Sequence, residues 1–386
     1  MFYKKSEIQK ENITIIETSD SCENQAKIRY QIVELLIYFG WPLFVMFILT
    51  LFLPLESIYL YLITVIVFIW PYLKGVAGKV IAKVKNVKDP RHCIRSSSFW
   101  YDGFLFAGSE PLRRIRKYSA LSESLDMTYN YFERFGVEPG NLKKDWWRKI
   151  TPFFFLNRLI KAWTDFWINM PGAQDVRTRL DIISKEIERI VKEVYIKEKD
   201  RCVKIAVLAG GTHQDVIVAV SLLLNNYPEM KIRIVSVDPD KDFSFSRSKQ
   251  LMKEFNVPEK IFFNIFERAS TKPEKKKSLS QVLKKNGYNF KEFDLVICIG
   301  LGDYMFGDKT IKFLSMLDNG KKIIISNISK KSMIEKIFLH MFIQWPEMQY
   351  LPLEGYLTIL EGAFKNNRKI KIIKTPLEVF NTAIIE

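Results

Sequence analysis

The sequence contains little of what builds a disulfide framework or a metal centre. Only four cysteines occur in 386 residues, together with three histidines. The cysteines are scattered, form no CxxC pair and have no histidine at metal-ligand spacing. They are Cys22, Cys93, Cys202 and Cys298. The spacing argues against a structural zinc site and predicts no metal, and reduced thiols suit a cytosolic setting.

Acidic residues are also in short supply. The chain has 43 Asp and Glu against 59 Lys and Arg, which gives a formal net charge of +16. Such a balance favours an anionic partner, either nucleic acid or the negatively charged cytoplasmic surface of a membrane.

Long apolar runs are confined to one place near the N-terminus. Residues 32–53 carry a single charge, Glu34, and residues 58–73 are apolar again after a short turn. At ~1.5 Å per residue the first run would reach roughly 33 Å as a helix, enough for the hydrocarbon core of a bilayer, and the second about 24 Å. We therefore predict a polar tail over residues 1–30 and a membrane hairpin of two helices over 31–78.

Basic residues flank the two runs on both sides, while the turn between them has neither Lys nor Arg. This asymmetry predicts a membrane anchor whose two ends lie in the cytoplasm. Three arrangements fit the pattern: a spanning hairpin, a hairpin that enters one leaflet, and a pair of buried core helices.

Residues 79–172 are rich in aromatic and basic side chains, including Trp146, Trp147, Trp163 and Trp167. Aromatic and cationic groups suit the headgroup region of a bilayer, and they also suit a lid over an apolar substrate. The third interpretation is a small helical subdomain packed on its neighbour. Nucleic-acid binding would use the same residue types but ranks below these, because an apolar hairpin lies just upstream.

A helix is predicted next, because apolar residues from Val176 to Val194 recur at steps of three and four. Arg177 and Arg179 lie in its first turns. They are either solvated surface charges or partners of a cofactor carboxylate or an acidic substrate.

From residue 203 onward, short apolar runs alternate with helical patterns. Strands are expected at 203–209, 232–237, 261–265, 295–299 and 322–326, with helices at 214–226, 245–255, 277–286 and 308–317. This alternation predicts an α/β, doubly wound, Rossmann-like domain over residues 173–386 with a mostly parallel sheet. Runs at 369–373 and 379–385 are too close for a crossover helix, so they should pair as a terminal antiparallel hairpin.

Four motifs in order lie where the expected strands end. Residues 208–213 (LAGGTH) follow the first strand, 237–240 (VDPD) the second, 293–304 (FDLVICIGLGDY) include the fourth, and 317–326 enter the fifth. A glycine turn before a helix aims backbone N–H groups at a ligand, and an acid after the second strand can accept both ribose hydroxyls. Both features point to a cofactor that contains a nucleoside.

With the terminal hairpin, these motifs resemble the class I S-adenosylmethionine-dependent methyltransferases. The resemblance implies S-adenosyl-L-methionine as cofactor, a methionine-binding first loop, a ribose acceptor at Asp238, an adenine site after the third strand, and a loop after the fourth that faces the reacting methyl group. The implied cofactor-binding residues are Ala209, Gly210, Gly211, Thr212, His213, Asp238, Pro239, Asp240, Asn264, Ile265, Phe266, Gly300 and Leu301.

The chain departs from the family pattern in the first strand and loop. Val207 stands where an acid is usual, and Ala209 and His213 replace two of three alternate glycines. Methyl transfer requires mainly that two partners be positioned and desolvated. Asp303, Tyr304 and His213 are the candidates for orienting or deprotonating an acceptor. Each has a structural alternative: Asp303 as a helix cap, Tyr304 as a packing aromatic and His213 as a hydrogen-bond partner of the loop.

The expected function is thus a membrane-anchored methyltransferase with a cytoplasmic catalytic domain and a lipid-soluble or membrane-associated acceptor. Three alternatives remain open: a nicotinamide-dependent oxidoreductase, an enzyme transferring the aminopropyl or carboxypropyl arm of the same cofactor, and a non-catalytic membrane-tethered binding module. Tryptophan and proline at 345–346 and the segment 350–352 lie where the family contributes substrate contacts. The sequence does not fix the oligomeric state.

Overall fold

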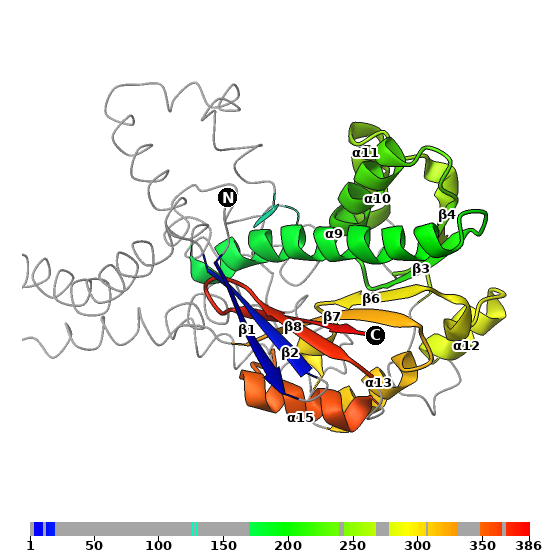
Figure 1. Cartoon of the computed structure of the whole chain (residues 1–386). Helices are drawn as coiled ribbons and strands as arrows, with labels where there is room; N and C mark the ends of the chain where they lie inside the picture. Colours follow the sequence, from blue (N-terminus) through cyan, green and yellow to red (C-terminus); the bar gives the residue numbers. More distant parts are fainter. Residues whose placement is uncertain are drawn as a thin grey trace, which may run out of the picture.

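The described chain forms three layers, with a nine-stranded sheet between two groups of helices (Figure 1). The structure is a computed structural model. It describes residues 4–10, 13–19, 126, 128–129, 170–238, 243–267, 278–305, 308–329, 348–364 and 368–386.

Five parallel strands form one side of the sheet, in the order β5-β4-β3-β6-β7, with β5 at the edge. They are β3 (Val203–Leu208), β4 (Ile232–Val237), β5 (Phe262–Ile265), β6 (Leu295–Ile299) and β7 (Lys322–Ile328). The runs of Val, Ile and Leu in β3, β4, β6 and β7 are largely buried on both faces, as expected of parallel strands covered on both sides. The predicted mostly parallel α/β sheet is confirmed.

Helices cover both faces of this sheet. One core cluster joins the sheet to α9 (Pro171–Lys197), α10 (Gln214–Asn226) and α11 (Phe243–Glu254), and the other joins it to α12 (Leu279–Lys285), α13 (Asp308–Leu317) and α15 (Leu353–Ala363). Figure 1 shows α9 lying across one face and α13 and α15 on the other. The sequence analysis did not predict α15.

The predicted antiparallel hairpin is confirmed. Strands β8 (Ile370–Lys374) and β9 (Phe380–Ile385) pair antiparallel, and β9 inserts between β7 and β8. The hairpin turn is fixed by Asp175 of α9, whose carboxylate accepts hydrogen bonds from the Thr375 hydroxyl at 2.6 Å and from the N–H groups of Leu377 and Val379. The start of α9 therefore lies at the carboxyl edge of the parallel strands.

The N-terminal residues differ from the predicted polar tail. Strands β1 (Lys4–Lys10) and β2 (Ile13–Ser19) pair antiparallel, and β2 adds to the sheet in parallel beside β8. Ile13 and Ile15 are buried in the core shared with α13 and α15, which is the physical reason for this pairing. Because β2 runs with the parallel strands, it too ends at their carboxyl edge.

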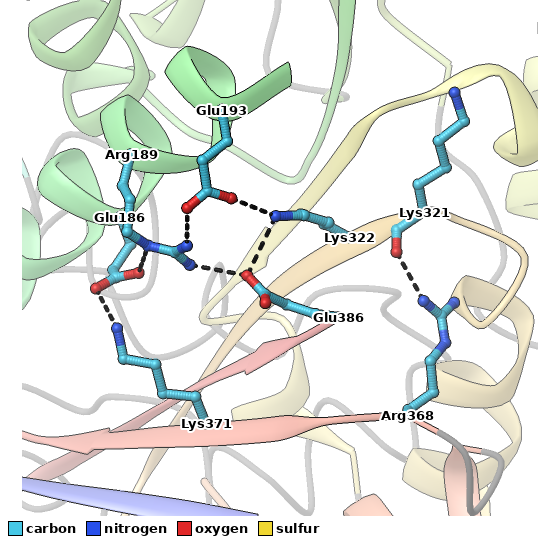
Figure 2. A network of polar contacts seen from close by, with 8 residues as sticks. All are labelled: Glu186, Arg189, Glu193, Lys321, Lys322, Arg368, Lys371 and Glu386. Atoms are coloured by element: carbon cyan, nitrogen blue, oxygen red, sulfur yellow. Dashed lines mark hydrogen bonds and ion pairs between the residues drawn. The ribbon is translucent and has the colours of Figure 1, made fainter. Parts of the chain in front are cut away.

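At the opposite edge, an ion-pair network connects α9 to the starts of β7 and β8 and to the C-terminus (Figure 2). Arg189 bonds both Glu186 and Glu386, Lys322 approaches Glu193 at 2.7 Å, and Lys371 approaches Glu186 at 2.6 Å. Half-exposed pairs contribute little singly, but here several charges share partners. The network holds α9 against the sheet, away from the predicted ligand edge.

The predicted membrane hairpin over 31–78 lies outside the described residues and stays a prediction. Among the helices that the structure does describe, none has the length and apolarity needed to cross a bilayer. Of the segment 79–172, the structure describes part of a helix at 126–129 and residues 170–172. Asp126, fully buried, bonds Arg247 of α11 at 3.0 Å, so this segment contacts the α/β domain.

Candidate functional site

The order of the strands reverses between β3 and β6, and ligands of open α/β sheets bind at the carboxyl ends on either side of such a point. The predicted loops after β3, β4, β5 and β6 all end at this edge, because the strands that precede them are parallel neighbours. The loops that contain the predicted cofactor-binding residues therefore begin at one edge of the sheet.

The first loop adopts an unusual backbone. Ala209, Gly211 and His213 all have φ near +55°, the left-handed region that normally favours glycine. These are the three positions of the family's alternate glycines, so the alternate-glycine geometry persists with alanine and histidine in place of two of them. Between them, Gly210 leaves no room for a side chain: a Cβ there would lie 2.5 Å from Cγ1 of Val207.

His213 points into the protein, away from any acceptor. Its side chain is 2% exposed, with Nδ1 2.9 Å from the Ser248 hydroxyl and Nε2 2.5 Å from the Ser236 hydroxyl. The Ser248 hydroxyl in turn donates to the carbonyl oxygen of Thr212, a buried residue of the same loop. Its geometry fits the structural alternative, in which the histidine fixes the glycine loop to β4 and α11, and it does not fit the predicted catalytic role.

Burial also lowers the pKa of His213, from 6.5 to about 4. The folded protein therefore holds a neutral imidazole between pH 4 and 6.5, where the unfolded chain binds a proton. The contribution of His213 to the free energy of unfolding should be fully present above pH 6.5. It should decline by roughly 3 kcal/mol as the pH falls to 4 and change no further below that value. Urea unfolding of wild type and His213→Gln at pH 7.5, 5.5 and 4.5 measures this. If the free energy of unfolding changed with pH in the same way for wild type and His213→Gln, the expectation would be contradicted.

Asp238 follows β4, as predicted for a ribose acceptor. One carboxylate oxygen, Oδ2, accepts a hydrogen bond of 2.9 Å from the N–H of Gly211 in the first loop. The side chain is half-buried at the strand end. This bond joins the first two cofactor motifs and fixes the carboxylate at the ligand edge. The neighbouring predicted residues, Pro239 and Asp240, lie outside the described residues.

A small pocket opens beside Asp238 at the ends of β4 and β5. Its lining includes Asn264, Ile265 and Phe266, the predicted adenine-flanking residues, together with Phe245 of α11. The rings of Phe245 and Phe266 meet edge to face, with centroids 5.1 Å apart. The two rings contribute an aromatic, apolar wall to this pocket. Sequence reasoning missed Phe245, although its place in the first turn after the acidic loop was a usable signal.

The loop after β6 places Asp303 and Tyr304 differently. Asp303 is 3% exposed, and its carboxylate accepts from the N–H of Ile328 at 2.8 Å, which ties the loop to the end of β7. Its geometry is that of a structural residue and does not fit the predicted role of acceptor base. Tyr304 is 37% exposed and is the only one of the three predicted catalytic side chains open to an acceptor. Gly300 turns this loop with φ +81°, and Leu301 begins the short helix that holds both residues.

A charged cluster lies at the same edge, and the sequence analysis left its role open. Arg179 of α9 is 4% exposed, lies 4.3 Å over the ring of Phe380 and donates to the Tyr129 hydroxyl. Burial lowers the pKa of this arginine, but Tyr129, Asp303 and Asp215 together outweigh burial and raise it, so the charge is retained. Its Nε has no hydrogen-bond partner among the described residues.

Asp215, in the first turn of α10, is the other member of this cluster. Burial raises the pKa of its carboxyl group, and the Val216 N–H and Arg179 oppose that effect. Helix α9, helix α10 and the loop after β6 thus bring Arg179 within electrostatic reach of the carboxyl groups of Asp215 and Asp303. Helical periodicity could place Arg179 near the start of α9, but it could not show that this arginine is buried.

No group of three or more metal-ligating side chains occurs within the described ranges. Cys202 is partly exposed and Cys298 buried, and neither forms a disulfide. The segment around 345–346 is outside the described residues, whereas Leu351 lines a second pocket beside β7.

No family model matches the chain, and no curated protein matches it. Several solved structures do match the chain. An O-methyltransferase candidate from Nostoc punctiforme is 12% identical, with TM-score 0.35, over 57% of this chain and 60% of that one. An O-methyltransferase family protein from Burkholderia thailandensis is 9% identical, with TM-score 0.39, over 81% and 71%.

Magnesium protoporphyrin IX methyltransferase from Synechocystis, solved with S-adenosylmethionine bound, is 12% identical, with TM-score 0.36, over 68% of this chain and 95% of that one. The neighbours therefore include methyltransferases with a mixed sheet. At these identities and TM-scores the likeness assigns no family or activity, so the function rests on the residues of this chain.

Proposed function

We propose that this chain is an S-adenosylmethionine-dependent methyltransferase. One observation supports the proposal: the Asp238 carboxylate bonds the N–H of Gly211 in the glycine loop, at the sheet edge where the buried Arg179 feels the carboxyl groups of Asp303 and Asp215. The amino-acid end of S-adenosylmethionine is a zwitterion, with one carboxylate and one ammonium group. A site that offers a cation and carboxyl groups beside a candidate ribose acceptor complements such a ligand.

The same observation disfavours a nicotinamide cofactor. A dinucleotide places its pyrophosphate at the N-terminus of the helix after the first strand, where the helix dipole attracts negative charge. Here that first turn contains Asp215, a carboxyl group that would repel phosphate when ionised. The absence of a GxGxxG motif at 208–213 agrees with this choice.

Under this proposal, the chain's residues mainly bind and orient. Arg179 holds the cofactor carboxylate, Asp238 the ribose hydroxyls, and Phe245 with Phe266 the adenine. The loop with Gly300 and Tyr304 faces the methyl group, and the exposed Tyr304 is the described side chain best placed to orient an acceptor. Bound cofactor supplies an electrophilic methyl group, which needs alignment with the acceptor rather than a base of fixed type.

The zwitterion contact can be tested with two ligands that share the nucleoside. S-Adenosylhomocysteine retains the amino-acid end, whereas methylthioadenosine lacks it. Calorimetric titration should show wild type preferring the former by about tenfold or more, as expected for a charge-assisted hydrogen bond of 1.5–3 kcal/mol. Arg179→Met should remove most of that preference. NADH should not bind.

Arg177→Met is the matched control, because Arg177 lies on the same helix but is half-buried and donates to the carbonyl oxygen of Thr128. It should retain the preference. A folded wild type that binds neither ligand would overturn the enzyme assignment and favour the membrane-tethered module. Product analysis then separates methyl transfer from transfer of the propyl arm, because only the former yields S-adenosylhomocysteine.

We further propose a membrane-associated acceptor and attachment of this chain to the cytoplasmic face of a membrane. The support comes from the two points at which the chain leaves the sheet and returns to it. Strand β2 ends and α9 begins at the carboxyl edge of the sheet, where the candidate site lies. The intervening segment, with its apolar runs at 32–53 and 58–73, leaves and rejoins the domain at that edge. Vesicle flotation of full-length chain against one lacking residues 31–78 tests this proposal, and equal flotation would contradict it.

A further inference from the structure

Two asparagines occupy core positions at the carboxyl end of the sheet. Asn327 of β7 is 3% exposed and Asn381 of β9 is 1% exposed, and the register places them directly opposite each other. The preceding pair on the same face, Ile325 and Ala383, packs into the apolar cluster shared with α13 and α15. Side chains alternate along a strand, so the asparagines face this same helix layer.

Their hydrogen-bonding capacity is unused. Neither amide atom of Asn327 has a partner within the part of the chain that the structure describes, nor does Nδ2 of Asn381. Buried amides in proteins nearly always find a partner, since burial without one is unfavourable. Two such groups side by side indicate that something else completes the pair.

Asn327 lines a pocket that is otherwise closed by neutral groups. Cys298, Gly302, Thr310 and Tyr356 contribute to its walls, and it has room for a group about the size of one water molecule. Burial raises the pKa of Cys298 to about 12 and that of Tyr356 well above its usual value, so both stay protonated. Gly302 belongs to the loop that carries Tyr304, which places the pocket beside the proposed acceptor region.

We infer that this pocket, together with Asn381, recognises a hydroxyl group of the methyl acceptor. The inference rests on the proposed function. An amide supplies both a donor and an acceptor, which complements a group that itself accepts and donates. A carboxylate is excluded because no cation lines the pocket to compensate for its desolvation, and the Asp303 carboxylate, which acts on Cys298 and Tyr356, would repel it. The group serves for recognition and is distinct from the atom that receives the methyl.

The test observes the two side-chain amides directly. Full-length protein with ¹⁵N-asparagine is titrated with benzyl alcohol and 2-phenylethanol, and separately with benzoate and phenylacetate, their charged counterparts. The amide signals are assigned by their loss in Asn327→Leu and Asn381→Leu. We expect both signals to shift and saturate with the neutral probes alone. Asn327→Leu should weaken binding about tenfold, measured from the remaining Asn381 signal.

Asn319→Leu is the control, because Asn319 is exposed at the far end of α13, and it should leave the titration unchanged. Signals that no neutral probe moves, or that charged probes move equally, would overturn the inference and leave a structural water site. A parallel titration with S-adenosylhomocysteine separates the two proposals. Failure there alone removes the cofactor, whereas failure of the neutral probes alone removes only the acceptor pocket.

Discussion

Replacing Asp238 by Ala should weaken binding of S-adenosylhomocysteine by at least about 100-fold. Two effects combine. The ribose loses a charged acceptor worth about 1.5–3 kcal/mol for each hydrogen bond, and the N–H of Gly211 loses the partner that holds the first loop. Calorimetric titration of the variant measures the loss, and circular dichroism checks that the fold is retained.

The variant Asp238→Asn separates these two effects. Its amide oxygen can still accept from Gly211, but the rest of the group no longer accepts both ribose hydroxyls. An intermediate loss is therefore expected. If Asp238→Ala bound the ligand as tightly as wild type, the nucleoside would have to lie elsewhere, and the proposed function would lose its ribose contact.

The second large effect concerns folding. Asp175→Ala should lower the free energy of unfolding by about 3–5 kcal/mol, because it leaves buried donors at the β8–β9 turn without their charged acceptor. Those donors are the Thr375 hydroxyl and the N–H groups of Leu377 and Val379. Urea unfolding followed by circular dichroism gives the change.

Asp181→Ala, on the same helix but at an exposed position, should change stability by less than about 0.5 kcal/mol. Equal midpoints for the two variants would mean that the hairpin turn is held by other contacts. Because the turn lies at the carboxyl edge, Asp175→Ala should also loosen the position of Arg179, one turn further along α9.

Regular elements of the C-terminal domain were predictable because most of its strands are buried on both faces. Short continuous apolar runs such as 232–237 and 295–299 are typical of buried strands, and the structure has strands at these residues. The predicted helices 214–226 and 308–317 have the same bounds in the structure. The N-terminal strands were missed because polar residues 4–10 have no such pattern. The pairing of β2 depends on β8, which is remote in sequence. The spacing of Leu353, Tyr356, Leu357 and Leu360 could have revealed α15.

For the site, position was predictable and role was not. The glycine loop, Asp238 and the residues after β5 follow strands whose order the alternation fixes. Whether a polar side chain faces ligand or protein depends on tertiary neighbours. His213 turns inward because Ser236 and Ser248 lie beneath it, and Asp303 because the end of β7 needs an acceptor. Arg179 is buried because Phe380 and Tyr129 close over it.

The pairing of β2 with β8 has a consequence for how the chain is made. About 350 residues separate β2 from its partner at 370–374, so β2 leaves the ribosome long before β8 does. At about 5–20 residues per second, the N-terminal strands wait roughly 20 to 70 s for that partner. During this interval the apolar runs at 32–53 and 58–73 also leave the ribosome, before the sheet can close. Ribosome-stalled chains that end before β8 should therefore carry an N-terminal hairpin without its place in the sheet, open to proteolysis.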